Sequence, residues 1–88
     1  MRSVHKHPFL HLSQPLQVQC SRLAKVVLVD TQHGVPTVWI EDVRDEAIHT
    51  MRRNFMVIGT GHPIPDGATH VGSLQQGAYV WHVYQLQP

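Results

Sequence analysis

The residues of this chain that could carry chemistry gather in one glycine-rich segment, residues 58–67. Its first half contains Gly59, Thr60, Gly61 and His62, and the two glycines allow positive φ angles and close backbone approach. Glycine-rich loops can hold a phosphate group with backbone N–H groups. This segment lacks the lysine and spacing of a Walker A loop, and it is not a GxGxxG pattern that opens a helix. The alternatives are a purely structural turn and a loop that contacts a ligand.

A second histidine could face this loop. His82 lies in an apolar segment, where strand alternation places it on the same face as Val80 and Tyr84. A buried imidazole in that position requires a hydrogen-bond partner. His82 is therefore either a satisfied core histidine or a pocket residue that faces His62.

Cationic and aromatic side chains supply the remaining ligand-binding candidates. Arg52 and Arg53 are adjacent, so in a strand one of them, for which we take Arg53, points into a concave face and could pair with a phosphate or carboxylate. The alternative is that Arg52 and Arg53 are surface residues of a strand and bind no ligand. Trp39 and Trp81 are either core residues or the wall on which a base stacks.

Metal binding and catalysis have weak signals. His5, His7 and His11 share one face of an extended strand, and an i, i+2 histidine pair can bind a metal, but no further ligand is suitably spaced. We therefore expect a solvated face, no metal and no cofactor. No Ser-His-Asp order, nucleophile elbow, HExxH motif or carboxylate pair is present, and Thr60 beside His62 only imitates a nucleophile and base. We expect no catalytic residues and no enzyme activity.

Composition excludes several classes of function. Hydrophobic residues make up 42% of the 88 residues and charged residues 15%, which is too apolar for a disordered chain. The formal charge of +1 provides no broad footprint for duplex nucleic acid. The longest apolar run, residues 26–29, is far shorter than the roughly 18 residues of a membrane span. The N-terminus has no apolar region of secretory length, and the only cysteine, Cys20, excludes an internal disulfide. We expect a cytoplasmic protein with no membrane partner.

Short alternating runs separated by turn signals must position the candidate residues. The expected strands are residues 5–12, 16–20, 24–30, 35–41, 49–58, 70–75 and 78–86. The first should be an edge strand, because it contains a proline, and should form a hairpin or bent pair with the second. Residues 24–30, apolar on both faces, are expected as a central strand paired antiparallel with residues 35–41.

Residues 42–54 permit two interpretations. Asp42 could cap a helix on which Val43, Ala47 and Met51 share a face. The interpretation that we favour makes residues 42–46 a hairpin loop, with at most one helical turn at residues 45–47, followed by a long strand to Ile58. The predicted fold is a mostly β, single domain over residues 1–88. It is an antiparallel β-sandwich or partly open barrel of six to seven short strands with at most one short helix.

Three segments together resemble a known family. They are Ile58-Gly59-Thr60-Gly61-His62-Pro63-Ile64, Val71-Gly72-Ser73-Leu74-Gln75 and Gly77-Ala78-Tyr79-Val80-Trp81-His82-Val83-Tyr84. Upstream, Gln32-His33-Gly34-Val35-Pro36-Thr37-Val38-Trp39 matches the turn and tryptophan strand of the same family. The family comprises small proteins of tailed phages and prophages and carries a domain-of-unknown-function label. The resemblance covers most of the chain from about Lys25 onward and implies origin rather than chemistry, while His5, His7 and His11 depart from the family pattern.

A phage origin places the protein in the host cytoplasm and suggests that it acts on the host by binding. Our leading hypothesis is a protein that sequesters a small host molecule, such as a nucleotide-type immune signal. Loop N–H groups and arginine would hold phosphates, and Trp39 or Trp81 would stack a base. The alternatives are a protein-interaction module that inhibits a host enzyme or defence complex, and a small virion or assembly component. A homo-oligomer is expected for the first, because a thin fold gains pocket walls from a neighbour.

Overall fold

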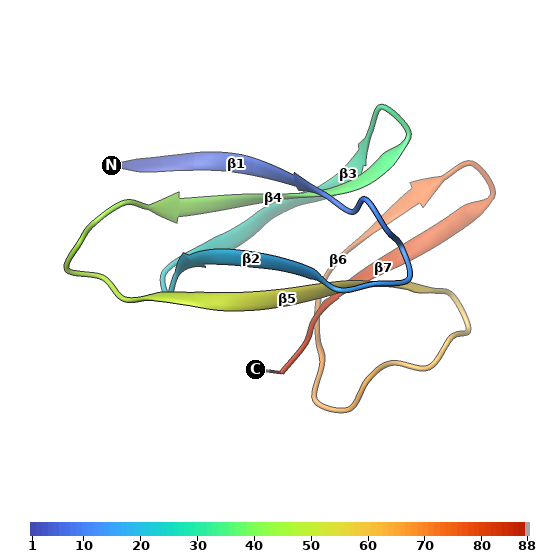
Figure 1. Ribbon diagram of the computed structural model, residues 1–88. Helices are drawn as coiled ribbons and strands as arrows, with labels where there is room; N and C mark the ends of the chain where they lie inside the picture. The colour runs from blue at the N-terminus through green and yellow to red at the C-terminus, as the bar shows by residue number, and fades with distance from the viewer. Residues whose placement is uncertain (88) are drawn as a thin grey trace.

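Seven strands form two antiparallel sheets in the computed structural model, which describes residues 1–87 (Figure 1). The strands are β1 (Arg2–Pro8), β2 (Leu16–Ser21), β3 (Lys25–Gln32), β4 (Val35–Val43), β5 (Thr50–Gly59), β6 (Thr69–Gln76) and β7 (Tyr79–Gln85). The described residues contain no helix, and so none that is long and apolar enough to cross a membrane. The mostly β sandwich predicted from alternation is confirmed.

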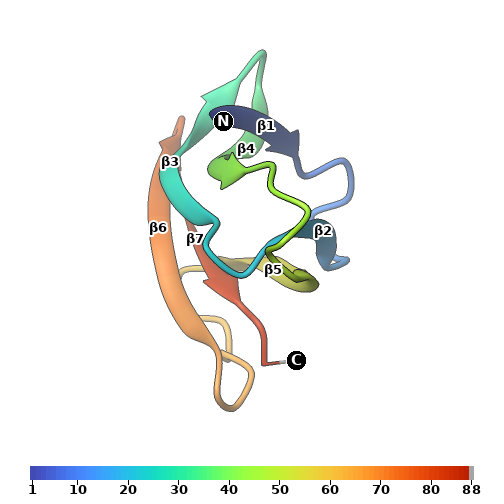
Figure 2. The same ribbon diagram turned by 90° about the vertical axis from the view of Figure 1, so that its left-hand side faces the viewer.

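The two sheets lie face to face. One has the strand order β1-β4-β3 and the other the order β2-β5-β7-β6, and Figure 1 shows the first sheet above the second. In Figure 2, where the sandwich is turned by 90°, β6 and β3 lie side by side at one edge and β1 and β2 lie toward the other. The β3–β6 edge is closed, and β1 and β2 leave the opposite edge more open.

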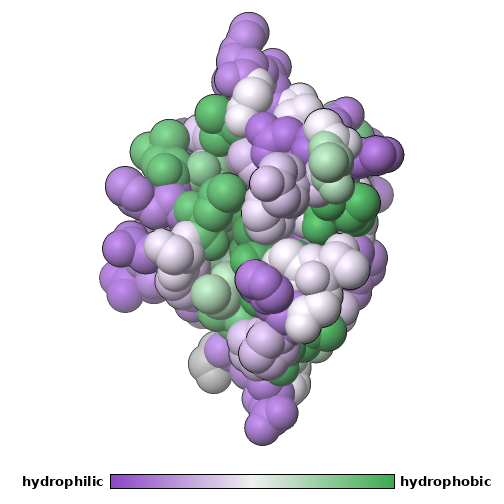
Figure 3. Space-filling model, turned by 90° about the vertical axis from the view of Figure 1, so that its right-hand side faces the viewer, coloured by the Kyte–Doolittle hydropathy of each residue, from purple (hydrophilic) through white to green (hydrophobic). Residues whose placement is uncertain are grey.

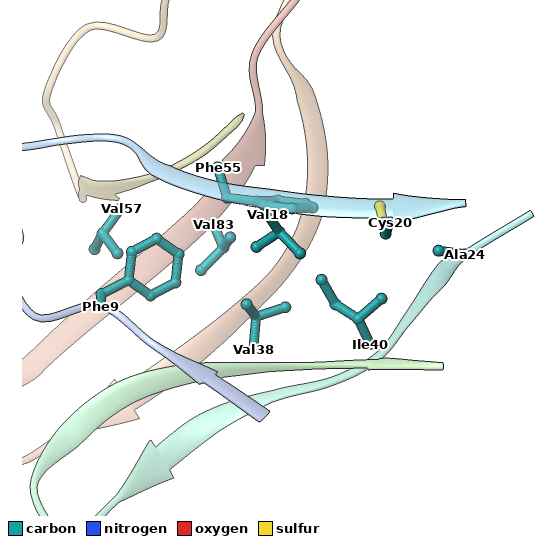
Figure 4. Packing of buried hydrophobic residues seen from close by; sticks show 9 residues of the cluster. All are labelled: Phe9, Val18, Cys20, Ala24, Val38, Ile40, Phe55, Val57 and Val83. Carbon is teal, nitrogen blue, oxygen red and sulfur yellow. The ribbon is translucent and has the colours of Figure 1, made fainter. Parts of the chain in front are cut away.

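The core comes from the inward residues of both sheets. Val38 and Ile40 of β4 point toward Val18 of β2 (Figure 4), and all three are at most 4% exposed. The ring of Phe9, from the β1–β2 connection, lies beside Val57 and is also buried. The alternation of apolar and polar residues along β2 therefore places its apolar side chains in this core. The core cluster comprises Phe9, Val18, Cys20, Ala24, Val38, Ile40, Phe55, Val57 and Val83.

The β3–β6 edge closes because a glycine lets the two sheets touch. A Cβ atom on Gly72 of β6 would lie 2.6 Å from Cγ2 of Val29 on β3, closer than real Cβ contacts allow. The ladder of β6 with β7 shifts register between His70 and Gly72, which marks a β-bulge. Bulges bend a strand and increase its twist, so this one helps β6 to follow the edge of the other sheet.

Two predictions about strand pairing were wrong. The segments at residues 5–12 and 16–20 do not form a pair, because β1 pairs with β4 and β2 pairs with β5 in the other sheet. Phe9 enters the core between them, so the connection crosses from one sheet to the other. β3 is not a central strand but the edge of its sheet, and its outer residues Val27 and Leu28 are 46% and 48% exposed. Although β3 carries apolar residues on both faces, its outer face is not buried.

Other predictions about the strands are confirmed. β1 is an edge strand, and β3 and β4 form the antiparallel hairpin. The long strand that we favoured over a helix is also present, since β5 begins at Thr50. The expected hairpin loop at residues 42–46 was wrong, because β4, which ends at Val43, and β5 belong to different sheets and do not pair. The chain turns between them where Ile48 N–H donates to Asp45 O at 3.0 Å. Asp45 Oδ1 accepts a further bond from Ala47 N–H at 2.9 Å, which favours a turn over a continued helix.

Candidate functional site

Strand β7 carries two of the candidate side chains, Trp81 and His82, and it lies between β5 and β6. In these ladders Trp81 is opposite Gly59 and Leu74, and His82 is opposite Ile58 and Ser73. Successive side chains of a strand point to opposite faces. Trp81 packs against the core cluster, so His82 lies on the outer face of the sheet.

The glycine-rich loop begins with a tight turn at the end of β5. His62 N–H donates to Gly59 O at 3.0 Å, and Gly61 has a φ of +88°, a conformation that favours glycine. A Cβ atom on Gly59 would lie 3.3 Å from Cζ3 of Trp81 and 3.5 Å from Nδ1 of His62. The absence of a side chain at Gly59 therefore lets the imidazole and the indole both lie against the end of β5.

Trp81 is held in one orientation by its neighbours. Its indole N–H donates to Gln76 Oε1 at 3.1 Å, and Gln76 Nε2–H donates to Gly34 O, in the β3–β4 turn, at 2.6 Å. Tyr79 stacks on Trp81 with ring centroids 5.6 Å apart and an interplanar angle of 17°. Tyr79 is 65% exposed, so the stacked pair presents an aromatic surface to solvent.

Two shallow depressions meet at this aromatic surface. One, of about 470 Å³, extends from Gly59 and Thr60 to the start of β7 at Tyr79. The other, of about 410 Å³, extends toward Leu12 and Met56. Both are lined by Gly59, His62 and Trp81, and no lysine or arginine lines either within residues 1–87. We call this end of the sandwich the aromatic end; Figure 3, which faces it, shows hydrophobic surface gathered between hydrophilic tips.

A chain of four polar side chains runs across the outer face of the same strands. Thr60 Oγ1 lies 2.9 Å from His82 Nε2 and donates to Val80 O at 3.2 Å. The other nitrogen of His82, Nδ1, lies 2.8 Å from Ser73 Oγ. His70 Nε2 lies 2.9 Å from the same Ser73 oxygen. His82 thus has a hydrogen-bond partner on each ring nitrogen, but these partners are on the outer face and His62 is not among them.

Two of the predicted site residues lie elsewhere. Arg53 points inward, where its NH1 and NH2 groups donate to Ala24 O at 2.7 Å and to Arg22 O at 3.0 Å. Its guanidinium therefore holds the β2–β3 connection and is already engaged. Trp39 is on β4, opposite Lys6 and Leu28, in the other sheet.

The histidines of β1 lie at one edge of the sandwich. Within the described part of the chain, no group of three or more His, Cys, Asp or Glu residues could hold a metal ion. His5 and His7 line a depression of about 340 Å³ at the β1–β2 edge together with Cys20 and Asp42, and His11 lies in the following connection. Burial lowers the pKa of His7, and the neighbouring His5 lowers it further. Burial also raises the pKa of the Cys20 thiol.

Sequence reasoning brought together Gly59, Thr60, Gly61, His62 and Trp81, and the structure places all five at or beside the aromatic end. It missed the residues that fix their orientation. Gln76 and Ser73 belong to a strand whose register depends on the bulge at residues 70–72, and alternation alone does not reveal that register. The sequence could have pointed to Gln76 and Ser73 only because they are polar residues in a predicted strand close in sequence to Trp81.

Comparison with known proteins adds one relationship. A family model described as a domain of unknown function, DUF7352, matches residues 1–88. No curated protein and no solved structure matches the chain significantly.

Proposed function

The chain belongs to the DUF7352 family, and we propose, from the geometry of the aromatic end, that it binds and sequesters a small planar molecule there. The observation that carries this proposal is the fixed arrangement of Trp81, Tyr79 and His62. Gln76 orients the indole through a hydrogen bond, and Gly59 leaves room for the imidazole beside it. A surface that is ordered before binding loses less conformational entropy when the ligand arrives.

A flat ring is the chemical group that suits this surface. Tyr79 and Trp81 lie nearly parallel, and the outer ring is largely exposed. Stacking of a nucleobase on an aromatic side chain contributes about 1–3 kcal/mol. His62 and Thr60 line the larger depression. The imidazole of His62 can exchange hydrogen bonds with polar atoms of a ligand, whereas the Thr60 hydroxyl is already bonded to Val80 O and His82. Nucleotide-type molecules meet these requirements.

The charge around the aromatic end narrows the class of ligand. Arg53 is bonded to two main-chain carbonyls, and the depressions have no lysine or arginine in their lining. A phosphate would therefore depend on backbone N–H groups of the loop at Gly59–His62. We favour a ligand with one or two phosphates over a triphosphate. In a phage setting such a ligand is a nucleotide-type host signal, and binding without turnover removes it from the host cytoplasm.

Thermal unfolding with a panel of ligands tests this function. The panel comprises cyclic dinucleotides, ADP-ribose, ordinary nucleotides and divalent metals. A ligand present at 100 times its Kd stabilises the fold by about 2.7 kcal/mol, which for a domain of this size is a shift of about 10 °C or more. Tyr79→Ala and His62→Ala should each reduce the shift, and Trp39→Phe is the matched control. A flat panel, or a shift that only Trp39→Phe abolishes, would contradict the proposal.

A second function is favoured by a different surface. The outer face of the β1-β4-β3 sheet carries Val4, Val27 and Leu28, which are 51%, 46% and 48% exposed, and Trp39 lies opposite Leu28. Exposed apolar surface of this kind is found at protein-interaction sites. Under this alternative the protein inhibits a host protein, Leu28→Glu abolishes its effect on the host, and Tyr79→Ala leaves that effect intact.

A further inference from the structure

The outer face of β5, β7 and β6 carries an arrangement that ligand sequestration does not use. Ser73 Oγ lies 2.8 Å from one nitrogen of His82, and Thr60 Oγ1 lies 2.9 Å from the other. A hydroxyl beside a base that is itself oriented by a third group is the geometry of an activated nucleophile. Trp81 points to the opposite face of the sheet, so this cluster is separate from the stacked rings of the aromatic end.

The bond from Thr60 to Val80 O assigns one tautomer to His82. If the single hydroxyl proton of Thr60 goes to Val80 O, Thr60 Oγ1 accepts from His82 Nε2, which then carries the imidazole proton. Nδ1 is then unprotonated and accepts the hydroxyl proton of Ser73. With that proton committed, Ser73 Oγ accepts from His70 Nε2–H at 2.9 Å. The lone pair of His82 therefore faces the serine, as a general base requires.

We propose that Ser73 is an activated serine that accepts acyl groups from esters of short carboxylic acids. His82 acts as the base, Thr60 is a positioning residue that holds the tautomer of His82, and His70 supplies an N–H donor near the reacting oxygen. The rings of Tyr84 and His70 pack edge to face with their centroids 5.3 Å apart, which restrains the donor.

The reaction balances within these groups and the ester. Ser73 Oγ attacks the ester carbonyl carbon while its proton moves to His82 Nδ1, and the negative charge collects on the former carbonyl oxygen, within reach of His70 Nε2–H. The carbon–oxygen bond to the alcohol then breaks, and the proton on Nδ1 leaves with the alcohol. The acyl group remains on Ser73. Water, deprotonated by the same nitrogen, hydrolyses this ester and restores the serine.

The surroundings favour short acyl groups and good leaving groups. Ser73 is exposed, and Val80, two residues before His82 on the same strand, is 39% exposed. An open sheet face cannot enclose a long acyl chain, and one imidazole N–H is a modest substitute for the paired donors of an oxyanion hole. The expected substrates are therefore activated esters, of which aryl acetates are the simplest.

The test treats the full chain with p-nitrophenyl acetate and follows acetylation by intact mass and peptide mapping. The chain provides its own matched control, because Ser3 Oγ lies 2.9 Å from His5 Nε2 and is also exposed. Within residues 1–87 no hydrogen bond orients the other nitrogen of His5. We expect the acetyl group on Ser73 and not on Ser3, and release of p-nitrophenol that Ser73→Ala removes and Ser3→Ala does not.

Variants of the other two residues separate catalysis from folding. His82→Gln should slow acetylation of Ser73 by about 100-fold or more, the usual range for loss of a general base. Thr60→Val should also slow it, and Thr60→Ser, which keeps the hydroxyl, should restore the rate. Each variant is checked for an unchanged unfolding transition. Equal labelling of Ser3 and Ser73, or a His82→Gln variant that folds and reacts at the normal rate, would overturn the proposal.

Discussion

Replacing Gly72 by alanine should force apart the edge at which the two sheets touch. The added Cβ atom would lie 2.6 Å from Val29 Cγ2 and 2.9 Å from Val29 Cβ. Both distances are too short, so either Val29 or the β6 backbone must shift. Val29 packs against the core cluster, and its displacement disturbs the packing of neighbouring side chains. Overpacking of this kind costs about 1–3 kcal/mol, and we expect a loss near the upper end.

Urea unfolding with a double-mutant cycle measures this contact. Val29→Ala removes two methyl groups and should cost about 1–2 kcal/mol on its own. It also removes the closest contact of the new Cβ atom, although Val29 Cβ remains. Gly72→Ala should therefore cost at least about 1 kcal/mol less when Val29 is already alanine.

The control is Gln75→Ala, at an exposed position of the same strand, which should change stability by no more than about 0.5 kcal/mol. The reasoning would be refuted if the Gly72 and Val29 substitutions proved additive within about 0.5 kcal/mol. Unchanged stability of Gly72→Ala would refute it as well, since the contact would then be relieved without cost.

Three further perturbations follow from single contacts. Arg53→Lys cannot keep both bonds to the β2–β3 connection and should lower the free energy of unfolding by about 1.5–3 kcal/mol in urea titrations, without changing the stabilisation by a bound ligand; a loss of ligand response alone would contradict this. Burial raises the pKa of Asp42, but hydrogen bonds from the Ser21 hydroxyl and from the Val43 and Ser21 N–H groups outweigh it, so the pKa is lowered. The stability that Asp42 contributes is present above about pH 3.9, the pKa of an aspartate in the unfolded chain, and it is lost as pH falls through the lower pKa of the folded state. Asp42→Asn should therefore flatten that part of the curve of stability against pH. An unchanged curve would contradict the role given to these hydrogen bonds. Gly59→Ala should displace His62 or Trp81 and weaken the thermal shift with ligand, whereas an undiminished shift would show that their placement does not matter.

The local pattern of apolar and polar residues was sufficient to predict where the strands lie but not which strands pair. Alternation and turn residues predicted six to seven strands, the β3–β4 hairpin and a long strand to Ile58, which the structure shows as β5. In the pairing of β1 with β4 the partners are distant in sequence, from Pro8 with Thr37 to Arg2 with Val43, and nothing within β1 specifies it. The prediction that β3 is a central strand failed because Val27 and Leu28 on its outer face are apolar but half-exposed.

For the candidate site, the sequence likewise identified residues but not the contacts that they make. Gly59, His62 and Trp81 were identified because glycines and aromatic residues are conspicuous in a short sequence. Arg53 was expected to point inward and does, yet its partners are main-chain carbonyls, which no side-chain pattern can reveal. Ser73 meets His82 only because a bulge sets the register of β6 against β7.

The central claim is that the aromatic end binds a planar ligand, and the two tryptophans allow a direct test. Their indole N–H groups give separate NMR signals, assigned with Trp39→Phe, and Trp81 contributes one that is bonded to Gln76. During titration with cyclic dinucleotides, AMP or ADP-ribose, a binding ligand should shift the Trp81 signal and the backbone signals of residues 59–62 and leave Trp39 unchanged. Shifts confined to Trp39, or no shift with any of these ligands, would contradict the account.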